Sequence, residues 1–276
     1  MSVAADAKSV VERPPPRARG WPRSRIVGYV LIGLWIAAGG GIVAYLALAW
    51  NSELFAKYGP SYLQGLGVTL SLVGISIVLG AILSLPVAYA RMSKNRILSG
   101  LAYCYVYFFR GTPLLVQTFL VYYGVGSFKP QLEMVGLWGF FREAFNCGVF
   151  AFALNTAAYQ AEILRGAIES VPKGQWEGAA SLGLHKLQTL WKIILPQALV
   201  VALRPYGNEL ILMIKASAIV AIITVYDLMG MAKLTYSRTF DIQAYIWVAV
   251  VYLVMVEVLR HAIEWIERRI TIHLKR

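Results

Sequence analysis

The chain has few charged residues and very few cysteines or histidines. Only 14% of its 276 residues are charged, against about a quarter in soluble globular proteins. The two cysteines, Cys104 and Cys147, lie in apolar surroundings, so a disulfide framework is excluded and two buried free thiols are predicted. The three histidines stand apart from one another, and no metal site is predicted from them.

Sequence motifs of enzymes are also missing from the chain. It contains neither His-Glu-x-x-His nor Gly-x-Ser-x-Gly, which argues against an intramembrane enzyme. It has no Gly-x-x-x-x-Gly-Lys-[Ser/Thr] loop, the motif that cradles nucleotide phosphates. The sequence therefore predicts a protein that is not an enzyme and binds no cofactor itself, so any ATP hydrolysis must occur on a separate polypeptide.

Apolar residues are abundant. They make up 58% of the chain, and the mean hydropathy is +0.61. The net charge of +12 lies between and beyond the apolar segments rather than on one amphipathic face, so the lipid bilayer is the predicted partner and nucleic acid is not. This composition predicts an all-α, polytopic membrane protein.

Six apolar segments reach the length of about 20 residues that a membrane-spanning helix needs. After a polar, proline-rich tail (1–25) predicted to be disordered, they cover residues 26–50, 61–90, 97–126, 145–166, 197–225 and 243–264. A short loop with Glu53 and Lys57 is expected before the second segment, and loops are expected at 127–143 and 226–242. As one straight helix, residues 97–126 would measure about 45 Å, so a break is expected at Arg110-Gly-Thr-Pro113, with Thr112 as the N-cap and Pro113 in the first turn of the following helix.

A hydrophilic island separates the fourth and fifth segments. Residues 173–182 have the pattern of a helix lying against a surface, and Gly183 is a suitable stop because glycine readily adopts the left-handed conformation. A second short helix is expected over 184–194, and Pro196 suits the first turn of the helix that follows.

The spacing of Glu177, Gly183, Ile193, Leu195 and Pro196 resembles the cytoplasmic signature of the membrane-spanning subunits of bacterial ABC importers. Two further stretches resemble the polar amino acid branch of that family: Tyr107-Phe-Phe-Arg-Gly-Thr-Pro-Leu-Leu-Val-Gln117, and Gly65-Leu-Gly-Val-Thr-Leu. The resemblance covers residues 61–276. One departure is Gly178, where the family usually has alanine, and glycine costs up to about 1 kcal/mol inside a helix.

The resemblance implies a type I ABC importer permease core (61–276), preceded by an additional transmembrane helix (26–50). It implies that the loop 165–196 carries a coupling helix that contacts the ATPase. It further implies two ATP-binding subunits holding ATP and Mg, a second permease subunit, identical or homologous, and a periplasmic substrate-binding protein. The loop Thr235–Asp241 favours the branch that carries histidine, basic amino acids and opines. The expected coupling residues are Glu177, Gly178, Ala179, Ala180, Leu182, Gly183 and Pro196.

Polar residues inside two apolar segments are candidates for the substrate pathway. Asn155, Tyr159 and Glu162 fall on one face of a helix, and polar groups within a membrane usually face a bundle interior or a water-filled cavity. Asn208 and Glu209 lie in the next segment. Gln117, which lies apart from the others in segment 97–126, is a further candidate. The alternative is that these side chains bond one another or cap interrupted backbone.

Basic residues are distributed asymmetrically. With both termini inside, eighteen Lys and Arg residues fall on the cytoplasmic side and five in the outer loops. The positive-inside rule then predicts cytoplasmic termini and a cytoplasmic Glu177 loop in a bacterial inner membrane. The competing class, a secondary transporter or channel for small polar solutes, predicts inverted repeats, and none is evident between the two halves of the sequence.

Overall fold

The computed structural model describes residues 22–50 and 52–271, except for the side chain of residue 54. The part of the predicted tail before residue 22 lies outside these ranges. The described residues form helices and turns without strands, which confirms the all-α prediction. The chain divides into two compact units, Met1–Ser52 and Glu53–Arg276.

The first unit contains one described helix, α1 (Arg23–Leu48). Its 26 residues correspond to about 39 Å at 1.5 Å per residue, enough to cross a bilayer core of about 30 Å. The helix continues through Gly39, Gly40 and Gly41. Its sequence is apolar on all sides, which is typical of a membrane span.

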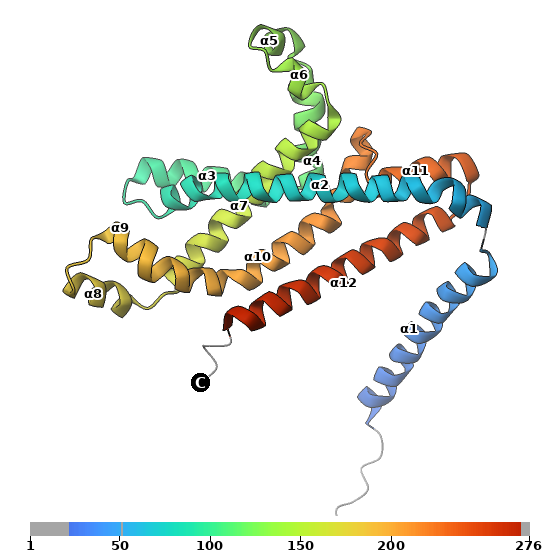
Figure 1. Cartoon of the computed structure of the whole chain (residues 1–276), viewed down its shortest axis with the longest axis horizontal. Coiled ribbons are helices and arrows are strands. Elements are labelled where there is room, and N and C mark those ends of the chain that lie inside the picture. Colours follow the sequence, from blue (N-terminus) through green and yellow to red (C-terminus); the bar gives the residue numbers. More distant parts are fainter. Residues whose placement is uncertain (1–21, 51, 272–276) are drawn as a thin grey trace, which may run out of the picture. The chain divides into compact units, whose positions relative to one another are not determined.

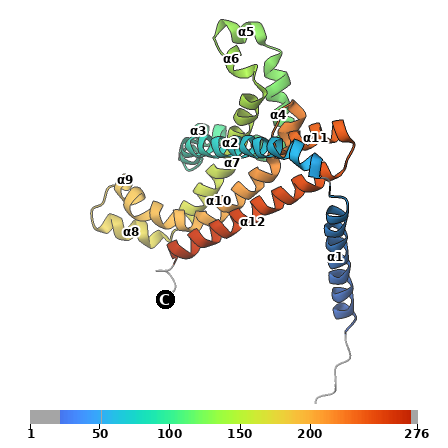
Figure 2. The same cartoon turned by 45° about the vertical axis from the view of Figure 1, so that its right-hand side comes forward.

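The second unit is a helical bundle (Figures 1 and 2). Helix α10 packs against both α7 and α12, α3 and α4 pack against α7, and α11 packs against α12. The elements, in order, are α2 (Ser52–Arg91), α3 (Arg96–Gly111), α4 (Leu114–Phe119), the π-helical η1 (Leu120–Val125), α5 (Lys129–Met134), α6 (Trp138–Phe141), α7 (Ala144–Glu169), α8 (Lys173–Ser181), α9 (Lys186–Thr189), the π-helical η2 (Leu190–Ile194), α10 (Leu195–Ser217), the 3₁₀-helical η3 (Ala218–Ile223), α11 (Leu228–Thr239) and α12 (Gln243–Thr271).

Helix α7 lies at the centre of this unit. Fifteen of its residues are buried, and many of them are alanines, small enough for neighbouring helices to approach closely. One apolar cluster joins α7 to α2, α10 and η3 through residues such as Leu72, Phe152 and Val220. A second joins α7 to the α8–α10 region through Leu164, Ile194 and Ala198 among others. Helix α7 therefore connects the core of the bundle with the hydrophilic island.

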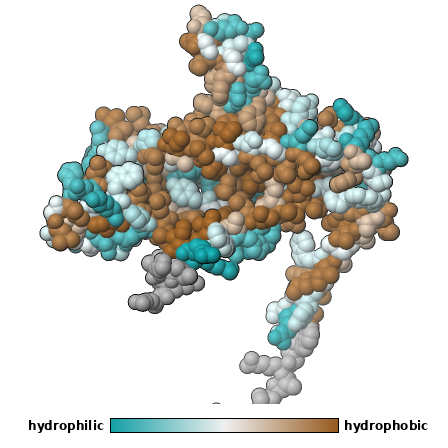
Figure 3. Space-filling model, viewed as in Figure 1, coloured by the Kyte–Doolittle hydropathy of each residue, from teal (hydrophilic) through white to brown (hydrophobic). Residues whose placement is uncertain are grey.

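Four described helical stretches are long and apolar enough to cross a membrane. They cover Arg23–Leu48, Phe55–Arg91, Lys186–Ile223 and Gln243–Thr271. The other two predicted spans correspond to the interrupted pair α3–α4 and to α7, whose polar residues lower its hydropathy. Figure 3 shows a broad hydrophobic surface across the bundle, while hydrophilic residues gather at its ends, including the α8–α9 end.

The break predicted at Arg110–Pro113 is confirmed, because α3 ends at Gly111 and α4 begins at Leu114. Thr112 was wrongly predicted as the N-cap of α4. Thr112 is the C-cap of α3, and its hydroxyl donates back to the carbonyl of Phe108 at 2.8 Å. Pro113 occupies the N-cap position in an extended conformation, as expected for backbone restricted by a proline ring.

Several predicted loops are helical in the structure. Glu53 and Lys57 belong to α2, residues 129–134 and 138–141 form α5 and α6, and residues 228–239 form α11. The expected short helix over 184–194 is also wrong as a separate element, since α9, η2 and α10 follow one another without interruption. Cys147 is buried as predicted, whereas Cys104 is exposed on α3.

The stretch Gly65–Thr69 of α2 holds the start of α11. A Cβ atom on Gly65 would lie 2.9 Å from the carbonyl oxygen of Asp227, so only glycine allows this approach. The Thr69 hydroxyl accepts a hydrogen bond from the amide of Leu228 at 3.1 Å, and the Asp227 carboxylate caps α11 by accepting from the amide of Gly230 at 2.8 Å. This part of the Gly-x-x-x-Thr-Leu motif is therefore explained by packing and capping.

Candidate functional site

The hydrophilic island folds as a short helix with a sharp end. After α8, Gly183 adopts a φ of +74°, as predicted for a helix stop. The amide of Gly183 donates to the carbonyl of Ala180 at 2.9 Å, and the amide of Leu184 donates to the carbonyl of Ala179 at 3.1 Å. This pair of bonds is a Schellman motif, which satisfies carbonyls that would otherwise end the helix without partners.

One face of α8 packs on its own chain and the other is open. Ala179 is only 3% exposed, and Trp176 packs on the cluster that contains Ile194. Glu177, Gly178, Ala180 and Leu182 are exposed, Leu182 at 80% of its surface. Gly183 and Pro196 are exposed too, so six of the seven predicted coupling residues are available to a partner, whereas Ala179 anchors the helix.

Pro196 lies in the first turn of α10, as predicted, directly after the π-helical turn η2. Proline has no amide hydrogen and crowds the preceding turn, and the wider π-helical turn accommodates both effects. The Gln197 side chain donates to the carbonyl of Ile193 at 2.8 Å. The island is therefore joined to α10 by a continuous helical segment.

A cleft of about 390 Å³ opens between α3, α7 and α10. It is lined by Arg110, Tyr159 and Glu162, together with apolar residues such as Val201, Ala202 and Pro205. The guanidinium carbon of Arg110 lies 5.1 Å from the centre of the Tyr159 ring. Two of the predicted pathway residues, Tyr159 and Glu162, thus share one cleft.

Glu162 is held by two arginines. Its Oε1 atom accepts from Nε of Arg91 on α2 at 2.8 Å, and its Oε2 atom accepts from Nη2 of Arg165 at 2.8 Å. Arg165 also binds Glu169 at 2.6 Å. The carboxylate of Glu162 therefore links α2 to α7 at the end of the bundle nearest the hydrophilic island.

Asn155 and Gln117 meet each other and the break between α3 and α4. The Asn155 amide donates to Gln117 Oε1 at 3.0 Å and to the carbonyl of Phe109 at 2.9 Å. The Gln117 amide donates to Phe109, to the Thr112 carbonyl and to the Thr112 hydroxyl. Because both side chains are buried, they satisfy backbone groups that the helix break leaves free.

Glu209 is buried in a polar network between three helices. Its carboxylate accepts a hydrogen bond from the Thr156 hydroxyl at 2.9 Å. Gln160 donates to Thr156 at 3.1 Å and to the carbonyl of Ile77 on α2 at 3.2 Å. This network connects α2, α7 and α10 without lining the cleft.

Asn208 faces a different surface. It is exposed and lines a groove of about 550 Å³ between α10 and α12, where Arg204 binds Glu267 at 2.6 Å. Arg204, Asn208 and Lys215 are all exposed and fall on one side of α10 by helical periodicity. A polar stripe of this kind is costly against lipid.

The sequence did not single out Arg110, Thr156 or Gln160 as site residues. Thr156 and Gln160 lie between the predicted residues on α7. Their link to Glu209 depends on how α7 packs against α10, and no local sequence pattern shows that packing. Arg110 stands inside a recognised motif and within an apolar segment, and that isolated charge is a signal that could have identified it.

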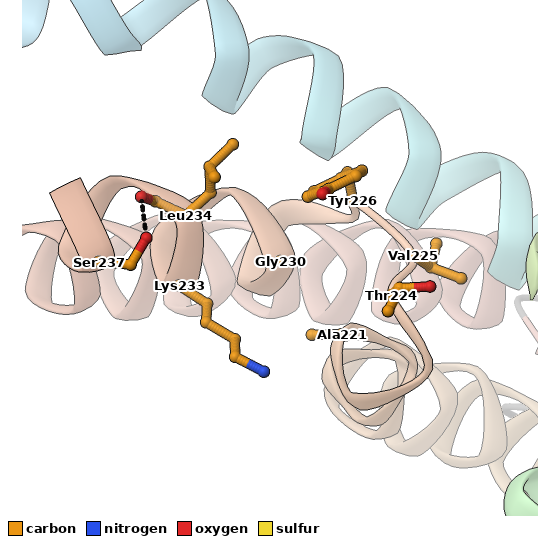
Figure 4. A pocket seen from close by; sticks show the side chains of 8 residues that line it. All are labelled: Ala221, Thr224, Val225, Tyr226, Gly230, Lys233, Leu234 and Ser237. Atoms are coloured by element: carbon orange, nitrogen blue, oxygen red, sulfur yellow. Dashed lines mark hydrogen bonds between the residues drawn. The ribbon is translucent and has the colours of Figure 1, made fainter.

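A smaller cavity of about 200 Å³ lies between η3 and α11 (Figure 4). Thr224, with a φ of 66°, forms the turn beside it, and the Ser237 hydroxyl donates to the carbonyl of Leu234 at 2.8 Å. Burial raises the pKa of the neighbouring Asp227 carboxyl, and the amides of Gly230 and Met229 act in the opposite direction. None of the predicted pathway residues lines this cavity.

With this fold and these sites, the chain has the features of a membrane-embedded transport subunit with an exposed short helix, α8. Residues 76–272 match the family of binding-protein-dependent transport system inner membrane components. The chain belongs to this family and is a permease, not an enzyme.

Named relatives give the same class. The chain is 45% identical over 202 residues to the nopaline transport system permease protein NocM of Agrobacterium fabrum strain C58, covering 73% of this chain and 84% of NocM. It is 40% identical to the octopine transport system permease protein OccM of Rhizobium meliloti, over 70% of this chain and 79% of OccM. It is 37% identical to the arginine ABC transporter permease protein ArtM of Escherichia coli K12, over 77% of this chain and 96% of ArtM.

Solved structures agree with the fold. A crystal structure of an amino acid ABC transporter with histidines is 36% identical and superposes with a TM-score of 0.70, covering 79% of this chain and 98% of that chain. An inward-facing MetNI methionine ABC transporter superposes with a TM-score of 0.64 at 20% identity, covering 76% of this chain and 96% of that chain. The second similarity concerns the fold alone.

Proposed function

We propose that this permease imports polar amino acids, including basic ones, or opine-like compounds into the cytoplasm, driven by ATP on two separate ATP-binding subunits. The observation that carries the coupling proposal is the exposed face of α8, where Glu177 and Leu182 project from a helix anchored by Trp176 and Ala179. The relatives named for nopaline, octopine and arginine support the substrate class.

In this proposal, α8 transmits motion from the ATPase to the transmembrane helices. ATP can favour one state of the transporter only if its subunits contact α8 differently in the two states. The uninterrupted helical segment from α9 through η2 to α10 supports such transmission, because Trp176 of α8 packs on the cluster that contains Ile194 and Ala198 of that segment. An exposed Glu177 contact would contribute below about 1 kcal/mol, so Leu182 is the expected main contact.

The polar stripe on α10 supports pairing with a second permease. Arg204, Asn208 and Lys215 would face that subunit, identical or homologous, or a water-filled pathway between the two. Tyr159 and Glu162 would face the substrate in the cleft, whereas Asn155, Gln117 and Glu209 would support the helices around it. A periplasmic binding protein would deliver the substrate from outside, with both termini of the permease in the cytoplasm.

Replacement of Leu182 by Glu tests the coupling proposal. The permease is tagged and purified with its ATPase subunits, and the amount of ATPase retained is measured. We expect at least a tenfold loss of retained ATPase, because a charge on an apolar contact is left without a partner, a cost of about 1.4 kcal/mol or more. Met134→Glu is the matched control, since Met134 is also 80% exposed but lies on α5.

Equal retention in the Leu182→Glu and Met134→Glu proteins would contradict the coupling proposal. Uptake that continues at full rate in cells lacking the ATPase subunits would instead favour a secondary transporter or channel.

A further inference from the structure

The cleft between α3, α7 and α10 offers hydrogen-bond donors but few free acceptors. Both oxygens of Glu162 are engaged: Oε1 by Arg91, and Oε2 by Nε and Nη2 of Arg165 at 3.1 and 2.8 Å. The Tyr159 hydroxyl is directed to the carbonyl of Arg110 at 3.4 Å. An amine or guanidinium group entering the cleft would have to compete with two arginines for Glu162.

Unlike Glu162 and the Tyr159 hydroxyl, the guanidinium of Arg110 is not engaged in a hydrogen bond with the described residues of this cleft. Within residues 22–50 and 52–271, its guanidinium takes part in no hydrogen bond or ion pair, and it lies over the face of the Tyr159 ring, 5.1 Å from the ring centre. Glu209 attracts Arg110 electrostatically, but that carboxylate is 6% exposed, binds Thr156 and does not line the cleft. Arg110 therefore presents up to five N–H donors to whatever occupies the cleft.

We propose that Arg110 is the carboxylate-recognising residue of this cleft, and that the transported compound binds there through a carboxylate. The proposal rests on the proposed function, since it takes the cleft as part of the substrate pathway. A guanidinium group and a carboxylate are both planar, and they can form two parallel hydrogen bonds in a bidentate pair. Val201, Ala202 and Pro205 form an apolar wall of the cleft, and a bound compound that displaces water from this wall would strengthen the contact.

The proposal predicts that the binding affinity of a compound depends on its number of carboxylates. A basic side chain gains little in the cleft because Glu162 is already paired. A compound with a second carboxylate, such as an N²-(carboxyalkyl) amino acid, has two groups that can reach Arg110. Affinity should therefore rise with the number of carboxylates when the rest of the molecule is kept constant.

Three probes with zero, one and two carboxylates test this order: argininamide, arginine and N²-(1-carboxyethyl)arginine. Equilibrium binding is measured by calorimetry on the assembled permease–ATPase complex without binding protein. We expect affinity to increase along the series, by about tenfold between the first and last probes. In the Arg110→Gln complex the three affinities should become equal within about twofold.

Two further variants control for structural damage. Arg142→Gln makes the same change at a residue whose side chain is 61% exposed and lies between α6 and α7, and it should keep the full order. Arg110→Lys keeps the charge without the planar geometry. The difference in affinity between the first and last probes should then lie between the differences measured for the wild type and for Arg110→Gln.

An Arg110→Gln complex that assembles and keeps the wild-type order overturns the proposal, as does a wild-type complex in which the two-carboxylate probe binds no better than argininamide. Either result leaves the coupling proposal intact, because retention of the ATPase on Leu182→Glu permease is measured separately.

Discussion

Gly80 lets α2 lie directly against α7. A Cβ atom at this position would stand 2.3 Å from Cγ2 of Thr156 and 3.0 Å from Nε2 of Gln160. Thr156 cannot simply rotate away, because its hydroxyl donates to the buried Glu209 carboxylate and accepts from Gln160. An added methyl group must therefore separate the helices or break the polar network.

Gly80→Ala should destabilise the permease by about 1–3 kcal/mol, the usual cost of overpacking a core. For a protein of this size that corresponds to a fall in Tm of about 2–4 °C per kcal/mol, measured by thermal aggregation of the purified complex. Gly74→Ala is the control in the same helix, where nothing lies within 4 Å of the added Cβ. A Tm for Gly80→Ala equal to that of Gly74→Ala would refute this account of the α2–α7 contact.

At the scale of single residues, the sequence identifies which polar side chains lie within apolar segments, but it does not identify the residues that they contact. The periodicity of Asn155, Tyr159 and Glu162 predicts one polar face of α7, and in the structure Tyr159 and Glu162 share a cleft. It could not show that Asn155 turns toward Gln117 and the α3–α4 break while Glu162 turns toward Arg91. Those partners come from other helices, and their positions depend on the packing of the whole bundle.

Gly178 inside α8 and Gly183 in the turn that ends it have opposite roles. Gly183 needs its left-handed conformation, in which a residue with a Cβ is disfavoured by about 1–2 kcal/mol. Gly178 lies inside the helix, and nothing lies within 4 Å of an added Cβ there. Alanine at Gly178 should therefore stabilise α8 by up to about 1 kcal/mol.

Hydrogen exchange of the amides in residues 173–182, followed by mass spectrometry, measures both effects. Gly178→Ala should slow exchange by up to about fivefold, and Gly183→Ala should speed it by at least a similar factor, because local opening free energies set the rates. The two variants are matched controls for each other, since each adds one methyl group, one inside α8 and the other in the turn that ends it. No change in Gly183→Ala would show that the Schellman motif does not determine the stability of α8. Faster exchange in Gly178→Ala would contradict the helix-propensity argument at that position.

Among the elements, long apolar helices and the α3–α4 break were predictable, but α11 and the start of α2 were not. The stretch 228–239 mixes polar and apolar residues, and its helix depends on the Asp227 cap and on packing of Leu228 and Ala232 beside Val248 of α12. The segment before residue 61 is predicted from the sequence to be a loop because it holds Glu53 and Lys57. In the structure, Phe55, Ala56 and Gly59 line a groove with Trp247 and Val251 of α12, a tertiary contact that no local pattern reveals.

At the scale of the whole molecule, the Lys and Arg residues counted for the positive-inside rule can be located within the unit Glu53–Arg276. The basic turn between α2 and α3, the α8–α9 segment and the arginines in the last turn of α12 lie toward one end in both views, and α11 lies toward the other (Figures 1 and 2). The turn is closed by Asn95, whose side chain accepts from the amide of Ile97 at 2.9 Å. The positive-inside rule assigns the first end to the cytoplasm.

Two serine-to-cysteine replacements test this orientation with little change in side-chain volume. Ser181 lies on α8 and Ser237 on α11, and both are exposed. They are introduced separately after Cys104 and Cys147 have been replaced, in cells without the ATPase subunits so that α8 stays uncovered. A membrane-impermeant maleimide should label Cys at position 181 in inside-out vesicles only, and Cys at position 237 in right-side-out vesicles only. The reverse pattern would place α8 outside the cell, where no ATP-binding subunit could reach it, and would refute the coupling proposal together with the orientation.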